Sequence, residues 1–454
     1  MNQPTVNRPN SDPQTAWLPY EPTSENPWSH RLAAHLFRRC TFGSSIGEIV
    51  AAEKAGHSQT LALIFQEVDD VAMEAEMATA GRLVTGGTDS NQLAAWWLLR
   101  MLKTPSPFLE NMTLFWHGHF ATGADKVLDA RAMLRQNQLL RKHALGRFEP
   151  MLKTISRDAA MLIYLDSEEN RKTRPNENYA RELMELFCLG PGNYTETDIK
   201  EIARCFTGWE VRKGRFAFNE HQHDKNSKAF LGSKGDFDGD DAIEIVLQQP
   251  AAAMFLAKKL IRYFVFDDEP ISDEFASPIA NRMRETGFDI RATVKTIVSS
   301  RVFFSPRAIG RKIKSPVELA IGFLRFFEAS TNCGRLGQQL ESLGQLPLYP
   351  PNVKGWAGGR SWINASTILA RANLITDILS NGKTKFKHGN LNDWAKQYSE
   401  AGVDQSVDWI ETYLLATPLA AQTRDDFTSL VKQSGSDPKR VLGWLAALPE
   451  FQLN

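Results

Sequence analysis

Two histidine pairs carry the side chains that most often bind metal ions in proteins. His117 and His119 flank Gly118, and residues two apart lie about 200° apart around a continuous helix. Their rings converge on one ion only if the helix stops near Gly118, which a glycine permits. Without that stop, we expect two core or capping histidines beside aromatic residues.

The second pair follows a predicted hairpin, where His221, Gln222, His223 and Asp224 are consecutive. In extended chain, alternate side chains point to the same face, so the two imidazoles would lie together. Imidazole nitrogen with carboxylate oxygen suits Zn, Mn or Fe. A solvated loop is the alternative, because the residues that follow are polar.

A third candidate is the polar face of a helix predicted over 175–189. Glu177, Arg181 and Glu185 follow at four-residue spacing, which is typical of a ladder of exposed ion pairs. In a second interpretation, Glu182 or Glu185 enters a buried site as a base, oriented by Arg181. Glu182 lies at the boundary of the apolar stripe, where burial perturbs the pKa of a carboxyl group.

Composition narrows the functional class. The 53 basic and 53 acidic residues balance, which removes the positive surface expected of a nucleic-acid-binding protein. The sequence contains no uninterrupted apolar run of about 20 residues, the length that a membrane-spanning helix needs, so no membrane span is predicted. The chain has no C-x-x-C pair, no glycine-rich nucleotide loop, no H-E-x-x-H and no G-x-S-x-G. The acidic run 236–241 lacks the glycine and glutamate of a calcium loop, and we interpret it as a helix cap.

The hydrophobic periodicity predicts a mainly α-helical protein, a large helical globular unit with a small β-hairpin near 209–218. Residues 1–26 are predicted to form a disordered or surface arm, and residues 27–380 the main helical domain. Residues 381–454 are predicted to form a C-terminal helical segment packed on that domain. No secretory leader is legible, so the chain as written is expected in the cytoplasm, or exported if a leader has been removed. The Pro/Gly/aromatic stretch 346–362 is typical of a loop that is functional or structurally pinned.

Long blocks of the sequence, in order, resemble a bacterial family known as domain of unknown function 1800. They cover residues 35–43, 111–123, 174–199, 206–209, 230–243, 314–319, 350–371 and 448–452. The resemblance implies a predominantly helical protein. It also implies a possible partner, because genes of this family often neighbour those of domain of unknown function 1501. Many members carry export signals, and position 118 is glycine where the family pattern has asparagine.

These observations support a first hypothesis, a hydrolase that depends on a divalent metal ion. The ion would lower the pKa of bound water, Glu182 or Glu185 would act as base, and Arg181 would stabilise negative charge. The metal ligands would be His117, His119, His223 and Asp224. The substrate, ring-bearing or a saccharide, would contact Trp116, Asn178, Trp209 and Trp356.

A second hypothesis assigns the protein to a different class, a non-catalytic helical accessory or assembly protein. The polar helix and the loop 346–362 would then form an interface with the product of the neighbouring gene. Trp356 and Trp362 would anchor that interface.

Overall fold

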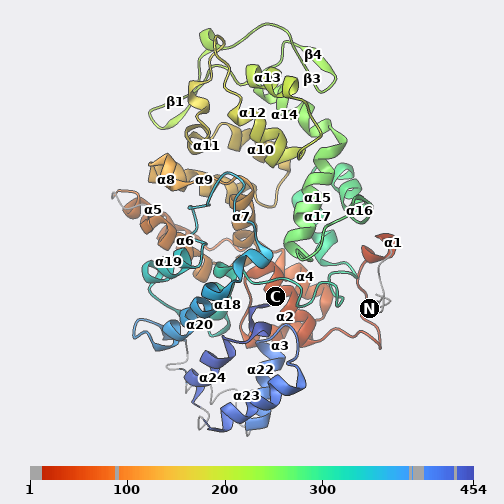
Figure 1. Cartoon of the computed structure of the whole chain (residues 1–454), viewed down its shortest axis with the longest axis vertical. Helices are drawn as coiled ribbons and strands as arrows, with labels where there is room; N and C mark the ends of the chain where they lie inside the picture. Colours follow the sequence, from red (N-terminus) through yellow and green to blue (C-terminus); the bar gives the residue numbers. More distant parts are fainter. Residues whose placement is uncertain (1–12, 87–90, 388–390, 392–402, 434–436) are drawn as a thin grey trace.

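The computed structural model describes residues 13–86, 91–387, 391, 403–433 and 437–454. These residues are mainly helical, with only two-stranded sheets, so the predicted fold class is confirmed (Figure 1). In the first part of the chain the elements are α1 (Pro13–Ala16), α2 (His30–Thr41), α3 (Ile46–Ala55), α4 (His57–Ile64), α5 (Val71–Val84), α6 (Asn91–Lys103), α7 (Pro107–His119), α8 (Ala124–Val127), α9 (Ala130–His143), α10 (Phe148–Ser156), α11 (Ala159–Tyr164) and η1 (Ser167–Glu169).

The central part contains a π-helical turn, η2, and two small hairpins. Its elements are α12 (Asn178–Glu182), η2 (Leu183–Cys188), α13 (Glu196–Cys205), β1 (Trp209–Arg212), β2 (Arg215–Phe218), η3 (Glu220–Gln222), β3 (Lys228–Phe230), β4 (Ser233–Gly235), α14 (Gly239–Gln248), α15 (Pro250–Phe264), α16 (Asp273–Glu285) and α17 (Ile290–Val298). Strands β1 and β2 pair antiparallel around Lys213 and Gly214, which confirms the predicted hairpin. Both turn residues have positive φ, as a tight hairpin turn of this type requires.

The remaining elements complete the lower half of the molecule in Figure 1. They are α18 (Pro316–Phe326), β5 (Ala329–Ser330), α19 (Cys333–Ser342), η4 (Gly359–Trp362), α20 (Ala365–Ser380), β6 (Lys385–Phe386), α22 (Val403–Tyr413), α23 (Ala421–Gln433), α24 (Pro438–Leu445) and η5 (Pro449–Gln452). Among the described residues, no helix combines the length and the apolar character needed to cross a bilayer.

Residues 13–20 are anchored to the body of the protein. The Trp17 indole donates to the Phe275 carbonyl at 2.8 Å, and the backbone N–H of Tyr20 donates to Ser299 at 2.8 Å. Both aromatic side chains are buried. Residues 13–20 of the predicted N-terminal arm therefore lie against the body of the protein, and residues 1–12 lie outside the described part.

Side-chain caps fix where several helices begin. Ser45 with Glu48, and Ser315 with Glu318, form reciprocal capping boxes at the starts of α3 and α18. Asp238 accepts the N–H groups of Asp240 and Asp241 at the start of α14. The acidic run at this position is therefore a helix cap, as its sequence predicts.

The C-terminal segment is held by buried polar contacts as well as by packing. Helix α22 contacts α2, and α24 contacts α20. The fully buried Arg371 of α20 donates through Nε to the Gln452 side chain at 2.7 Å and through Nη2 to the Lys314 carbonyl at 2.7 Å. The Lys314 ammonium donates to the Phe451 carbonyl at 2.7 Å. These bonds join 449–453 to the entry of α18.

Candidate functional site

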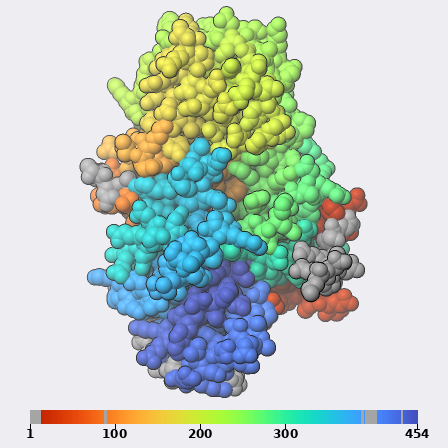
Figure 2. All heavy atoms as spheres, in the orientation of Figure 1, coloured from red at the N-terminus to blue at the C-terminus, as the bar shows by residue number. Residues whose placement is uncertain are grey.

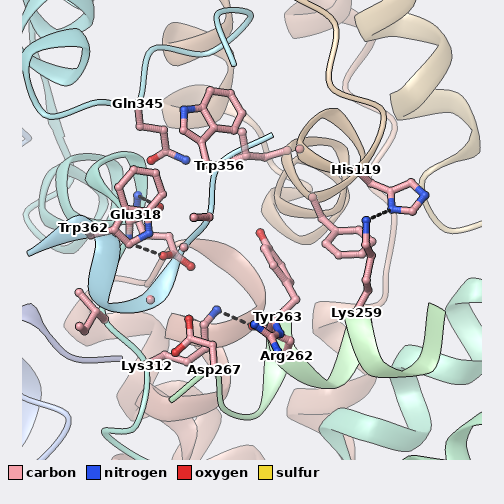
Figure 3. A pocket seen from close by; sticks show the side chains of 18 of the residues that line it. His119, Lys259, Arg262, Tyr263, Asp267, Lys312, Glu318, Gln345, Trp356 and Trp362 are labelled. Carbon is pink, nitrogen blue, oxygen red and sulfur yellow. Dashed lines mark hydrogen bonds between the residues drawn. The ribbon is translucent and has the colours of Figure 1, made fainter. Parts of the chain in front are cut away.

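A cavity of about 240 Å³ opens between α7, α15, the entry to α18 and the loop 346–362. In Figure 2, the light-blue segment that contains this loop crosses the face of the molecule between the orange and green segments. Aromatic side chains and ionisable groups meet in this cavity (Figure 3). The aromatic, ionisable and amide side chains that line the cavity include Phe115, His119, Lys259, Arg262, Tyr263, Asp267, Lys312, Glu318, Gln345, Lys354, Trp356 and Trp362.

Helix α7 continues through Gly118 and ends at His119, so the stop that would make the two imidazoles converge does not occur. The rings consequently serve different partners. His117 is buried beside Trp97, and its Nε2 accepts the backbone N–H of Leu348 at 3.1 Å. Burial lowers the pKa of His117 to about 3, so the imidazole is neutral at physiological pH.

The hydrogen bond between Leu348 and His117 helps to dock the loop 346–362 on α7. A close backbone approach also contributes, in which a Cβ at Gly355 would lie 2.3 Å from the carbonyl oxygen of Gly118. Gly355 also has φ +74°, where other residues are strained. This docking places Trp356 over the cavity, with its ring centroid 5.6 Å from that of His117.

The Pro191 ring and the π-helical turn η2 together free two carbonyl groups for side-chain donors. Phe187 would bond the N–H of residue 191 in an α-helix, but proline has none. The N–H of Gly190, the α-helical partner of Leu186, donates instead to Met184. π-Helical turns of this kind occur frequently at functional sites.

His119 and Lys259 use these freed carbonyls. Lys259 Nζ lies 3.0 Å from His119 Nδ1 (Figure 3) and 3.0 Å from the Leu186 carbonyl oxygen. His119 Nε2 lies 3.1 Å from the Phe187 carbonyl oxygen. The Nε2–H of His119 therefore donates, and its Nδ1 accepts from the lysine ammonium. Burial lowers the pKa of Lys259 to about 8. Burial, with the adjacent lysine charge, holds the pKa of His119 well below its usual value.

The floor of the cavity carries two carboxyl groups from different elements. Asp267 follows α15, and Glu318 lies in the first turn of α18, where its Oε2 accepts the Ser315 N–H at 2.6 Å. Burial raises the pKa of Asp267, although the charges of Lys312 and Arg39 oppose that shift. Burial lowers the pKa of Lys312, and the negative charge of Glu318 offsets part of the effect. Lys312 Nζ donates to the Tyr263 carbonyl at 2.5 Å.

The four residues predicted to bind a metal ion are not brought together. The 220–222 segment is a 3-10 turn rather than extended chain, so His221 and His223 do not form an alternating pair. His223 Nδ1 lies 2.9 Å from the Thr207 oxygen, and Asp224 accepts Arg204 Nε at 2.7 Å. Within the described ranges, no group of three or more His, Cys, Asp or Glu residues is arranged to hold a metal ion. The ligand set of His117, His119, His223 and Asp224 is thus corrected.

The predicted catalytic helix face lies outside the lining of the cavity. Arg181 pairs with Glu177 at 3.4 Å and with Glu196 at 2.8 Å rather than with Glu185. Glu185 accepts the Tyr194 hydroxyl at 3.3 Å. Burial and the neighbouring Glu185 charge raise the pKa of Glu182, which lies at the edge of the apolar stripe.

Of the residues predicted to contact substrate, Trp356 lines the cavity. Trp116 is fully buried, and its indole donates to the Ala144 carbonyl at 2.8 Å. Trp209 is buried against Phe206, and Asn178 is exposed at the start of α12. Trp116, Trp209 and Asn178 therefore do not belong to the cavity.

Several cavity residues carry no motif in the sequence. Lys259 and Tyr263 lie on α15, whose mostly apolar surface predicts only a core helix, and Asp267 follows it three residues beyond its end. Their polar atoms share one cavity only because α15 packs beside η2 and the entry to α18. Trp362 lies in the Pro/Gly/aromatic loop 346–362, which the sequence marks as functional or structurally pinned, and its side chain is buried in the cavity wall.

The comparisons with known proteins agree with the motif blocks. The family model described as "Protein of unknown function (DUF1800)" matches residues 35–453 of the 454-residue chain. No curated protein and no solved structure matches the chain. The matched range includes every cavity residue described above. The chain therefore belongs to the DUF1800 family of proteins of unknown function.

Proposed function

We propose that this cavity is the active site of a hydrolase that acts on a ring-bearing, anionic substrate of the saccharide class. The observation that carries the proposal is the meeting of two carboxyl groups, Asp267 and Glu318, in one aromatic-lined cavity. Paired carboxyl groups in unlike environments are the usual means by which glycoside-type bonds are hydrolysed.

The environments of the two carboxyl groups favour different roles. Burial raises the pKa of Asp267, which suits a proton donor to the oxygen of the leaving group. Glu318 accepts the Ser315 N–H through its side chain and lies near the positive charges of Lys312 and Arg39. Glu318 would take a proton from the attacking water, whose oxygen bonds to the substrate carbon as the bond to the leaving group breaks. Proton exchange with solvent then restores both groups.

The rest of the lining supports the proposed substrate class. Phe115, Tyr263, Trp356 and Trp362 supply flat apolar surfaces on which a ring can lie. Four basic side chains line the cavity, namely Lys259, Arg262, Lys312 and Lys354, against the two carboxyl groups. This excess of positive charge favours a substrate that carries a carboxylate or phosphate.

Hydrolysis of nitrophenyl glycosides and esters, neutral and anionic, tests the proposal. We expect turnover of an anionic glycoside and a drop in kcat of about 10²–10⁴-fold in both Asp267→Asn and Glu318→Gln. Glutamine at 318 retains an oxygen for the capping bond, so α18 should still begin at Pro316. Glu244→Gln, on the surface of α14, is the control. Undiminished turnover in Glu318→Gln, or no turnover of any substrate in the panel, would contradict the proposal.

A further inference from the structure

A second, smaller cavity shares Glu318 with the larger one, and an arginine without a hydrogen-bond partner at two of its nitrogen atoms lines it. Arg38 of α2 is 8% exposed, and its Nε and Nη2 atoms are fully buried without a hydrogen-bond partner in the described part of the chain. Leaving a charged donor buried and unpaired costs several kcal/mol. A buried guanidinium of this kind needs a counter-charge or acceptor, and the described residues supply none to these two nitrogen atoms.

The cavity has a volume of about 40 Å³ and lies between α2, the residues 42–44, α18 and α22. Its polar lining consists of Arg38, Ser44, Lys314, Glu318 and Tyr413. Ser44 is 4% exposed, and its hydroxyl oxygen is also buried without a partner. Two unsatisfied polar side chains therefore border the same small space.

The charges around this space favour an anion over water alone. The lining carries the guanidinium charge of Arg38 and the partly protonated amine of Lys314, against the single carboxyl group of Glu318. Burial, together with the charges of Arg39 and Arg31, lowers the pKa of Arg38 to about 9. Burial, with the Arg38 and Arg371 charges, lowers the pKa of Lys314 to about 7. A bound water would satisfy donors but would leave this repulsion between cations uncompensated.

We propose that this cavity binds a small inorganic anion, held by the Nε–H and Nη2–H of Arg38 and by the hydroxyl of Ser44. The guanidinium edge presents two parallel donors, the geometry that suits an anion best. The anion would join α2 to the residues that precede α3. The proposal depends on Arg38 and Ser44 and not on the chemistry assigned to the larger cavity.

Thermal unfolding of the full chain in different sodium salts tests this site. At equal ionic strength, we expect chloride to raise Tm above its value in gluconate by about 2–4 °C, with a dependence that saturates. A matched series in phosphate distinguishes an oxyanion from a halide. A saturating rise in phosphate alone assigns the site to an oxyanion. Equal Tm values in all three salts would show that the cavity holds water only and would overturn the proposal.

Two variants and a control connect the effect to the cavity. Ser44→Ala should weaken the apparent anion affinity several-fold, and Arg38→Met should abolish the anion-specific rise. Arg325→Met is the matched control, because Arg325 also has a buried, unpartnered Nε but does not line this cavity. If Arg38→Met does not fold, the Ser44→Ala result decides. An unchanged chloride or phosphate dependence in Ser44→Ala, or its loss in Arg325→Met, would contradict the assignment.

Discussion

At the scale of single residues, burial and not metal ligation governs the histidines of the 111–123 block. His117 accepts a backbone N–H, and His119 bridges Lys259 and the Phe187 carbonyl. Each ring is neutral, because desolvation penalises its charged form. The two imidazoles therefore position other groups, the loop 346–362 in one case and the Lys259 ammonium in the other.

The neutral state of His117 has a consequence for stability. In the unfolded chain a histidine gains a proton as the pH falls through about 6.5, whereas folded His117 gains one only near pH 3. The unfolded state therefore binds more protons between these values, and the free energy of unfolding falls as the pH falls.

We expect wild type to lose about 2 kcal/mol more than His117→Gln between pH 7.5 and pH 5. Urea unfolding at the two pH values measures this difference. His221→Gln, at an exposed position, should keep the pH dependence of the wild type. An identical pH dependence in wild type and His117→Gln would show that this imidazole is not buried in its neutral form.

At the scale of elements, the cavity depends on how the loop 346–362 sits on α7. The chain leaves α19, bonds His117 through Leu348 and passes Gly118 so closely that only glycine fits at 355. Trp356 follows directly and Trp362 ends η4. The wall that Trp356 forms is thus held by the contacts of Leu348 and Gly355 with α7.

Gly355→Ala tests this docking. The added Cβ would lie 2.3 Å from the Gly118 oxygen, so we expect the loop to shift and the protein to lose about 2–4 kcal/mol of stability. Gly358→Ala is a matched control, since Gly358 has φ +75° but no atom lies within 4 Å of the place that its Cβ would take. It should cost only the backbone strain, about 1–3 kcal/mol, because φ +75° with ψ −174° is a conformation that residues other than glycine rarely adopt. Equal losses in the two variants, measured by urea unfolding, would contradict the role of the close approach.

The sequence predicts where helices begin better than it predicts which residues form the candidate site. Capping residues such as Ser45, Asp238 and Ser315 act locally, and a helix begins directly after each of them. The course of α7 through Gly118 is not predictable, because glycine permits a helix stop but does not require one. The pairing of Asp267 with Glu318 depends on packing between α15 and the entry to α18, which no local pattern encodes.

At the scale of the whole molecule, residues 449–453 connect α20 with the segment that leads into α18. Arg371 of α20 holds both the Gln452 side chain and the backbone at Lys314, which leads into α18 and the floor of the cavity. The C-terminal segment is consequently connected to the candidate site through buried hydrogen bonds.

Arg371→Met should loosen this connection. It leaves two buried acceptors without their donor, at a cost of about 1–3 kcal/mol each. We expect faster hydrogen exchange in α24 and at 449–453, measured by mass spectrometry. Arg335→Met, which removes an exposed pair with Asp377 of the same helix α20, should leave exchange there unchanged. Unaltered protection in Arg371→Met would show that packing alone holds the segment.

The most direct test of the central claim is ligand binding at the aromatic-lined cavity, measured by saturation-transfer nuclear magnetic resonance with glucuronate and glucose as probes. The account predicts transfer to the ring protons of glucuronate, weaker transfer to glucose, and loss of both signals in Trp356→Ala. Equal transfer from wild type and Trp356→Ala, or no transfer to either sugar, would contradict it.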